Sequence, residues 1–319
     1  MKALVTGADG FIGSHLTERL LSEGHEVRAF CLYNSNGSAG WLDGLDHKRL
    51  KVVLGDIRDA RQVEVACRGV DVVYHLAALI DVPYSYQAPE SYVQTNILGT
   101  LNVLEGIRRA DVGRVVITST SEVYGTTTNL PIRETHPLQA QSPYAASKIA
   151  ADQLALSYWC SFGTPVVILR PFNTYGPRQS TRAVLSSILT QLLEGRETIK
   201  LGRTDTRRDL TFVTDTANGL MLAGTTPRIN GEVIQLGTGI SPSIHEIFET
   251  ACMVLGKRAN LTMRPELMRP MASEVLVLQS DPSKARDLLG WSPWVYLADG
   301  IKRTANWLAS KKGLTSTAA

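Results

Sequence analysis

Residues 3–13 read Ala-Leu-Val-Thr-Gly-Ala-Asp-Gly-Phe-Ile-Gly, and this stretch decides the fold. The apolar run at residues 3–5 predicts a buried strand, and a helical pattern follows from residue 14 to residue 22 and ends at Gly24. Between strand and helix stand Gly7, Gly10 and Gly13, at the spacing of a tight turn that lets a helix pack closely on the preceding strand. The order strand, glycine turn, helix predicts the first unit of a parallel α/β sheet.

The same glycine turn predicts a binding site for the pyrophosphate of a dinucleotide. Gly7 would form the turn, Gly10 would let the backbone approach the phosphates, and Gly13 would allow close helix–strand packing. Phe11 and Ile12 stand between Gly10 and Gly13, just before the expected helix, whose N-terminus offers free N–H groups and the positive end of a dipole. We therefore expect these five residues to contact a cofactor.

Strand-like and helical patterns alternate through the first half of the chain, which argues for a parallel sheet covered on both faces. The strands are expected at residues 27–32, 52–54, 70–76, 114–118 and 166–169, and helices between them include 91–110 and 144–162. The predicted fold class is α/β, a Rossmann-type doubly wound parallel sheet with a smaller, interleaved C-terminal α/β substrate domain. The expected division is 1–170 for the dinucleotide-binding domain, with a return of about 209–240, then 171–319 for the second domain, ending in a frayed tail at 313–319.

Composition excludes several classes of protein. The 319 residues carry a net charge of +3 without a basic run, so no nucleic acid partner is expected. No apolar run approaches the roughly 20 residues that span a bilayer, and the first strand begins at about Lys2, leaving no room for a signal peptide. A cytoplasmic protein is expected. The four cysteines lack metal-ligand spacing, so they predict reduced thiols and no metal site: Cys31, Cys67, Cys160 and Cys252.

Tyr144 and Lys148 supply the first candidates for catalysis. They lie four residues apart in Ser-Pro-Tyr-Ala-Ala-Ser-Lys (residues 142–148), a spacing that puts both side chains on one face of a helix. A free tyrosine has a pKa of about 10, and a neighbouring cation lowers that pKa. We therefore expect Tyr144 to accept a proton from a hydroxyl group whose carbon loses hydride.

Further motifs place the chain in a known group. Besides the glycine turn and the Tyr144/Lys148 pair, they are residues 55–59 (Gly-Asp-Ile-Arg-Asp), 75–78 (His-Leu-Ala-Ala), 96–102 (Asn-x-x-Gly-Thr-x-Asn), 119–125 (Ser-Thr-Ser-Glu-Val-Tyr-Gly), 170–178 (Arg-Pro-Phe-Asn-x-Tyr-Gly-Pro-Arg) and 208–215 (Arg-Asp-x-x-Phe-Val-x-Asp). Over nearly the whole chain this set resembles the extended short-chain dehydrogenase/reductase superfamily, and within it the sugar-nucleotide epimerases and dehydratases.

That resemblance implies roles for particular residues. Asp56 and Ile57 would flank the adenine of the cofactor, Lys148 would also hold the nicotinamide ribose, and Thr120 would complete the catalytic group with Tyr144. Leu76, Ala77 and Ala78 would bind the cofactor, with residues 77–79 lining its channel. The diphosphate and sugar of a nucleotide-sugar substrate would be held by Asn173, Arg208 and Arg269, with Arg178 as a nearby candidate. The helices at 91–110 and 144–162 resemble those that join two copies into a homodimer.

The cofactor predicted is NAD, with NADP as an open alternative. NAD-preferring members of the group usually carry an acidic residue at the end of the second strand, where it bonds both ribose hydroxyls. Here that position holds Cys31. No Lys or Arg directly follows Cys31 to welcome a 2′-phosphate, so nothing in the sequence favours NADP.

Glu122 is the residue that indicates which reaction to expect. A 4,6-dehydratase oxidises C4 of its sugar and then needs a base for the C5 proton, and Glu122 is suited to this role because it stands two residues after Thr120, just beyond a strand end. The triplet Thr120-Ser121-Glu122 resembles that of 4,6-dehydratases, many of which have an acid where Ser121 stands, so the acid for the leaving hydroxyl is either Glu122 itself or Ser121 acting through water.

The longer context resembles the nucleotide-sugar 4,6-dehydratases of the legionaminic-acid pathway, which act on GDP- or UDP-N-acetylglucosamine. The expected protein is thus an NAD-dependent lyase. A 4-epimerase, a UDP-glucuronate decarboxylase and a non-catalytic dinucleotide sensor are the alternatives.

Overall fold

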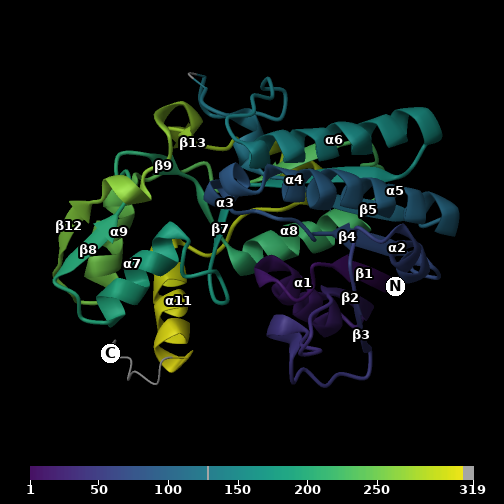
Figure 1. Cartoon of the computed structure of the whole chain (residues 1–319), viewed down its shortest axis with the longest axis horizontal. Coiled ribbons are helices and arrows are strands. Elements are labelled where there is room, and N and C mark those ends of the chain that lie inside the picture. The colour runs from purple at the N-terminus through teal and green to yellow at the C-terminus, as the bar shows by residue number, and fades with distance from the viewer. Residues whose placement is uncertain (128, 312–319) are drawn as a thin grey trace.

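A seven-stranded sheet forms the centre of the molecule in the computed structural model, which describes residues 1–127 and 129–311. The strand order is β11-β6-β5-β4-β1-β2-β3, and every pair in this sheet is parallel (Figure 1). The order runs outward in both directions from β1 and β4, so the sheet is doubly wound and the point of reversal lies between these two strands. The predicted fold class is confirmed.

The elements of the described residues follow in chain order. They are β1 (Lys2–Thr6), α1 (Phe11–Ser22), β2 (Glu26–Leu32), β3 (Leu50–Gly55), α2 (Ala60–Cys67), β4 (Val72–His75), α3 (Val82–Gln87), α4 (Pro89–Tyr92), α5 (Gly99–Ala110), β5 (Arg114–Thr118), α6 (Pro143–Phe162), β6 (Val166–Pro171), β7 (Asn173–Tyr175), α7 (Val184–Leu193), β8 (Thr198–Leu201), β9 (Arg207–Arg208), β10 (Leu210–Phe212), α8 (Val213–Thr225), β11 (Val233–Leu236), α9 (Ile244–Val254), β12 (Asn260–Met263), β13 (Val277–Leu278), α10 (Ser283–Leu289) and α11 (Leu297–Lys311).

Helices cover both faces of the sheet, as buried parallel strands require. Helices α1 and α8 lie on one face, where Leu16 and Leu20 pack with Leu220 in one apolar core. Helices α2, α5 and α6 lie on the other, where Val103 and Ile107 belong to a second core (Figure 1). Both layers therefore exclude water from the strands and leave the ends of the strands free for a site.

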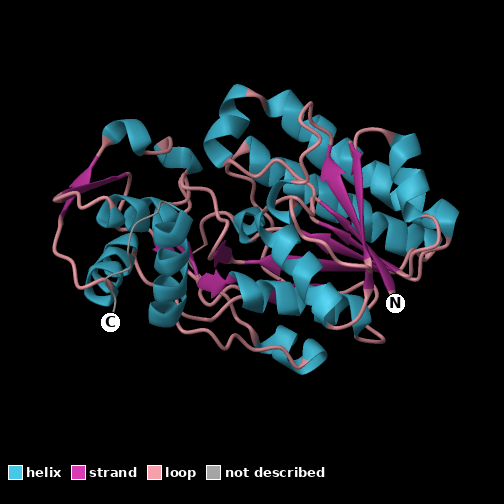
Figure 2. Ribbon diagram, turned by 90° about the horizontal axis from the view of Figure 1, so that it is seen from below, coloured by secondary structure: helices cyan, strands magenta, loops and turns pink. Residues whose placement is uncertain are grey.

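The chain leaves this sheet after β6 and returns to it later. Strand β11 pairs with β6, and α8 packs against α1, whereas β10 pairs with β7 outside the main sheet. Helices α7, α9 and α11 enclose a separate apolar core beside the small pair β8–β12 (Figure 2). The expected boundary at residue 170 stays a prediction, and the expected tail at 313–319 lies outside the described residues.

One expected helix is divided. In place of a continuous helix over 91–110, the short α4 is followed by a π-helical segment, Val93–Leu98, and then by α5. The expected strand at 114–118 has the predicted bounds, as β5. Within residues 1–127 and 129–311, no helix combines the length and the apolar composition needed to cross a membrane.

Candidate active site

The glycine turn has the geometry that a pyrophosphate needs. Gly7 has φ +66°, and a Cβ added at Gly13 would lie 2.1 Å from the Gly7 carbonyl oxygen, so only glycine fits there. Gly10 is the N-cap of α1 and supplies no side-chain cap. The first N–H groups of α1 are therefore free to bind phosphate oxygens, and the predicted contacts Phe11 and Ile12 stand at this helix end.

The motif at residues 75–78 meets the glycine turn where the sheet order reverses. A Cβ at Gly7 would lie 2.8 Å from the Ala77 Cα, so the two segments touch. Thr6 Oγ1 accepts hydrogen bonds from the N–H groups of Leu76 and Ala77, both at 3.2 Å. His75 joins Thr6 at 2.8 Å, and burial lowers the pKa of His75 to about 3, so the imidazole is neutral at ordinary pH. The two predicted cofactor motifs thus meet at the adjacent ends of β1 and β4.

Asp56 and Ile57 stand just after β3. The Arg58 side chain, whose Nε donates to the Asp56 carboxylate at 3.0 Å, holds the pKa of Asp56 below its usual range. Ile57 is buried, and Asn102 Nδ2 donates to its carbonyl at 3.0 Å. A Cβ at Gly99 would meet the Ile57 side chain at 2.7 Å, which explains the Asn96-x-x-Gly99 motif as packing around Ile57.

Asn96 connects the expected cofactor channel to the catalytic helix. Its Oδ1 accepts from the Leu79 N–H at 2.8 Å, and its Nδ2 donates to Ser147 Oγ at 2.9 Å. Ser147 lies on α6 between Tyr144 and Lys148. The segment 77–79 and the catalytic pair are therefore held in a fixed relation.

Tyr144 stands in the first turn of α6, which begins with the N-cap Ser142 and Pro143. The Tyr144 ring is 7% exposed, and burial raises the pKa of its phenol, while a hydrogen bond with the Thr120 side chain opposes that rise. The expected lowering of this pKa by Lys148 is absent, because the Lys148 ammonium donates to the Thr118 carbonyl at 2.7 Å. Within the protein, burial therefore acts against the phenolate form of Tyr144.

Lys148 has a buried carboxylate close to it. Burial lowers the pKa of Lys148 to about 8, and the charge of Asp152, one turn further along α6, opposes that fall. Asp152 is fully buried and accepts hydrogen bonds from Ser119 Oγ at 2.9 Å and Arg170 Nε at 3.0 Å. The sequence analysis missed Asp152, although its spacing of eight residues from Tyr144 puts it on the same helix face.

Glu122 and Ser121 are both buried at the C-terminal end of β5. The Glu122 N–H donates to Thr120 Oγ1 at 3.2 Å, which starts a short 3₁₀ turn, Ser121–Tyr124. Glu122 Oε1 lies 3.6 Å from Arg269 Nη1, an ion pair longer than a hydrogen bond. The structure thus brings the predicted base and a predicted substrate contact together.

Arg208 and Arg269 share a second carboxylate. Arg208 Nη2 donates to Glu274 Oε1 at 3.0 Å, and Arg269 Nη1 lies 4.0 Å from the same oxygen. Burial lowers the pKa of Arg208, and the charges of Glu122 and Glu274 raise it. Glu274 was not predicted, because its position after residue 269 shows no spacing rule that would place it beside Arg208.

Asn173 and Arg178 lie on the segment that follows β6. Asn173 begins β7, and its Oδ1 is buried without a hydrogen-bond partner, so it can accept a hydrogen bond from a ligand. Arg178 forms an ion pair with Glu18 of α1 at 2.7 Å and has φ +72°. The structure therefore ties Arg178 to the helix behind the glycine turn, and joins Arg208 to Arg269.

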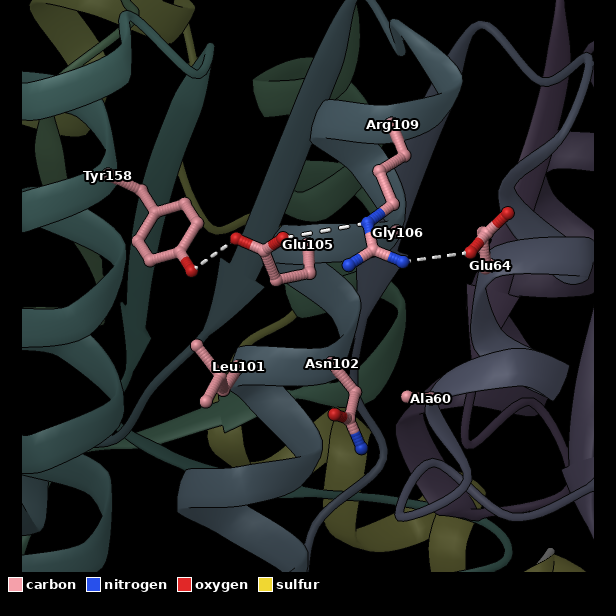
Figure 3. Close-up of a pocket in the computed structure, with 8 residues that line it drawn as sticks. All are labelled: Ala60, Glu64, Leu101, Asn102, Glu105, Gly106, Arg109 and Tyr158. Carbon is pink, nitrogen blue, oxygen red and sulfur yellow. Dashed lines mark hydrogen bonds and ion pairs between the residues drawn. The ribbon is translucent and has the colours of Figure 1, made fainter.

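A pocket of about 350 Å³ lies elsewhere, between α2, α5 and α6 (Figure 3). Its lining includes an ion-pair and hydrogen-bond chain, in which Arg109 Nη1 lies 3.2 Å from Glu64 and the Tyr158 hydroxyl donates to Glu105 at 2.6 Å. None of the predicted site residues lines it. We therefore place the candidate active site at the strand ends and not in this pocket.

Comparison with known proteins agrees with this geometry. The family model for GDP-mannose 4,6-dehydratase matches residues 4–304. A dTDP-glucose 4,6-dehydratase of an Actinoplanes species is 34% identical over 98% of this chain and 99% of its own length. A UDP-glucose 4-epimerase of Mycolicibacterium smegmatis is 33% identical over 98% of this chain and 99% of its own length.

The solved structures that resemble this chain also include both a dehydratase and an epimerase. The dTDP-glucose 4,6-dehydratase DesIV of Streptomyces venezuelae, solved with NAD, has a TM-score of 0.89 and 34% identity, covering 98% of each chain. A UDP-glucuronic acid 4-epimerase of Bacillus cereus, solved with UDP-glucuronic acid and NAD, has a TM-score of 0.89 and 30% identity, covering 98% of this chain and all of the other. Both reactions occur among relatives of equal similarity. The chain therefore belongs to the GDP-mannose 4,6-dehydratase family, within the extended short-chain dehydrogenases/reductases.

Proposed function

We propose that the protein is an NAD-dependent nucleotide-sugar 4,6-dehydratase, and that the buried carboxylate of Glu122 carries this assignment. Glu122 follows Thr120, and its charge raises the pKa of Tyr144, so the two acid–base groups face one space. A 4-epimerase needs no second base, because its hydride returns to C4 and its C5 proton is never removed. Removal of the C5 proton needs a second acid–base group, and the buried Glu122 beside Tyr144 is suited to supply it.

The residues at the turn and strand ends fit NAD. The glycine turn leaves room for the pyrophosphate, and the free N–H groups of α1 complement its charge. NAD supplies the acceptor for the C4 hydride and later returns the hydride to C6. The positive charge that the oxidised cofactor would bring favours the phenolate form of Tyr144, whereas burial in the protein opposes it.

In the first step Tyr144 removes the proton of the C4 hydroxyl. Thr120 orients the phenol through their hydrogen bond, and Lys148 turns from the Thr118 carbonyl toward the nicotinamide ribose and the phenolate. The resulting C4 ketone acidifies the C5 proton. Glu122 then removes that proton and passes it to the C6 hydroxyl, which leaves as water. Buried Ser121 is the alternative donor, acting through water.

The substrate diphosphate would be held by Arg208 and Arg269. Both guanidinium groups lie near the carboxylate of Glu274, and that of Arg269 also lies near Glu122. A diphosphate can replace these carboxylates as the partner of the two arginines. Asn173 offers its unpartnered Oδ1 to a sugar hydroxyl, and Arg178 remains the additional candidate. The substrate proposed is GDP- or UDP-N-acetylglucosamine.

A nucleotide-sugar 4-epimerase is the second candidate, because relatives named as epimerases are as similar as those named as dehydratases. The isotope pattern of the product separates the two. A dehydratase in ²H₂O incorporates deuterium at C5 and moves a C4 label to C6, giving a 4-keto-6-deoxy sugar. A C4-inverted product without label at C5 would contradict our proposal. Release of carbon dioxide from a hexuronic acid would indicate a decarboxylase, and no turnover with normal cofactor binding would indicate a sensor.

A homodimer through α5 and α6 is part of the proposal. The two helices pack side by side on one face of the sheet. Leu98, just before α5, is 40% exposed, and Phe162, the last residue of α6, is 58% exposed. A second copy would cover these apolar groups. Light scattering at micromolar concentration should give twice the mass of one chain, and the mass of a single chain would contradict this part.

A further inference from the structure

Strand β2 ends without the acidic side chain that usually bonds the hydroxyls of an adenosine ribose. Cys31 holds that position in the sequence, and the structure buries its side chain completely in the core beneath α1. Burial raises the pKa of the Cys31 thiol to about 12. Cys31 therefore stays a neutral, fully buried thiol that is closed off from a ribose.

The polar side chains of the following loop are already engaged. Asn34 Oδ1 accepts from two N–H groups of its own loop, at 3.2 and 3.1 Å, and its Nδ2 donates to two carbonyls. Asp43 accepts from Ser38 Oγ and from the Ala39 N–H at 2.7 Å. These bonds close the loop on itself, so neither side chain is free to replace the missing acid.

A carboxylate reaches the end of β2 from another part of the chain. Asp9 belongs to the glycine turn, and the Gly7 N–H donates to the Phe30 carbonyl at 2.9 Å, which holds this turn against β2. The main chain of Leu32 hydrogen-bonds the Asp9 carboxyl. The charge of Asp9 also acts on the Cys31 thiol. The Asp9 side chain thus stands beside the residue that the usual acid would occupy.

Contacts from the loop after β2 fix Asp9 in this place. The Trp41 N–H donates to the Asp9 carbonyl at 3.2 Å. A Cβ at Gly40 would lie 2.7 Å from that carbonyl oxygen and 3.1 Å from the Asp9 Cβ, so only glycine lets the loop lie so close. The Trp41 ring in turn packs on Trp307 of α11, with ring centroids 5.5 Å apart. Asp9 is therefore held through its backbone, and its side chain is half-buried.

Burial raises the pKa of Asp9, and the main-chain hydrogen bonds oppose that rise. A carboxylate that has lost part of its water gains from new hydrogen-bond donors. Two adjacent ribose hydroxyls supply such donors, whereas a 2′-phosphate would bring like charge to the same place.

We propose that Asp9 takes the place of the missing acid at the end of β2, where it accepts hydrogen bonds from the adenosine ribose of NAD and disfavours the 2′-phosphate of NADP. The inference rests on the proposed function for the presence of a dinucleotide and is independent of the reaction at the sugar. It makes Asp9, a residue of the pyrophosphate turn, the determinant of cofactor choice.

The test measures dissociation constants for NAD and NADP by calorimetry on the wild-type chain, Asp9→Asn and Asp46→Asn. Asp46 is exposed near the same loop, so its variant makes the same change of charge. The wild type and Asp46→Asn should prefer NAD. Asp9→Asn should bind NAD roughly ten- to a hundredfold more weakly, as expected for lost charge-assisted hydrogen bonds. Its affinity for NADP should be unchanged or higher.

Wild-type protein with 2′-deoxy-NAD supplies a measurement that needs no variant. The wild type should bind 2′-deoxy-NAD more weakly than NAD, and Asp9→Asn should bind the two alike. Equal binding of NAD and NADP by the wild type, an unchanged preference in Asp9→Asn, or an equal effect of Asp46→Asn would overturn the role of Asp9 alone. Failure of the wild type to bind any dinucleotide would overturn the proposed function together with it.

Discussion

Lys148 and Asp152 lie one helical turn apart on α6, and the buried carboxylate of Asp152 opposes the loss of the proton from the Lys148 ammonium. Asp152 in turn is paired with Arg170, and both side chains are excluded from solvent. A buried ion pair therefore acts on the charge state of a proposed catalytic lysine.

This relationship predicts a pH dependence. Burial lowers the pKa of Lys148 to about 8, so kcat/KM should fall as pH rises through about 8, because the ammonium loses its charge. From Lys148 alone, the free energy of unfolding should rise with pH between about 8 and its ordinary pKa, since there the unfolded chain holds a proton that the folded chain has released.

Asp152→Asn should move the alkaline limb of the kcat/KM profile to lower pH, because it removes the charge that raises the pKa of Lys148. That variant leaves Arg170 buried without its counter-ion, which commonly costs about 3–5 kcal/mol of stability. The double variant Asp152→Asn/Arg170→Gln removes both charges and keeps the test possible. A limb that stays at the wild-type pH in the double variant would contradict the role of Asp152.

Tyr144→Phe should lower turnover by roughly 10²–10⁴, the usual range for loss of a general base. The affinity for NAD should be retained, because only the hydroxyl is removed. Tyr158→Phe is the matched control on the same helix, since its hydroxyl bonds Glu105 on the outer surface. Near-normal turnover of Tyr144→Phe would show that another group accepts the C4 proton.

Glu122→Gln should permit the first hydride transfer and stop before the loss of water. Tyr144, Lys148 and Thr120 are intact in this variant, so reduced cofactor should accumulate on the protein. Its absorbance at about 340 nm measures this accumulation. Glu266→Gln, an exposed glutamate, should behave as the wild type. Full turnover of Glu122→Gln to a dehydrated product would assign the C5 base to another residue.

Arg269→Gln should raise KM for the nucleotide sugar roughly tenfold to a hundredfold, because a charge-assisted contact to the diphosphate is lost. NAD affinity should not change. The exposed Arg258→Gln loses the same charge without a contact near Glu122 and is the control. An unchanged KM in Arg269→Gln would remove this residue from the substrate site.

The parts of the fold that the sequence predicts best are those with a single physical cause. The centre of the strand Arg114–Thr118 is buried on both faces, so its sequence shows a short apolar run, Val-Val-Ile, with clear limits. The helix expected over 91–110 was less simple. Its π-helical segment carries Asn96, which must reach Leu79 and Ser147, and no local pattern signals those partners.

In the candidate site, too, the contacts between residues far apart in the sequence could not be predicted from local patterns. The pair Tyr144 and Lys148 follows from helix spacing, but the direction of the Lys148 ammonium depends on a carbonyl that lies 30 residues away. Glu274 meets Arg208 only because of how the chain folds back over 66 residues. Cys31 was found at the position that matters for cofactor choice, but its inward orientation is a property of the packed sheet.

The return of the chain to the central sheet limits where the chain can be divided. Strand β11 forms the edge beside β6, so a fragment ending at residue 170 would lack both this edge and the cover that α8 gives to α1. Such a fragment would expose unpaired backbone and apolar surface, the usual route to aggregation. A cut or an exchange at residue 170 would therefore separate the first half of the chain from the strand and the helix that complete its sheet.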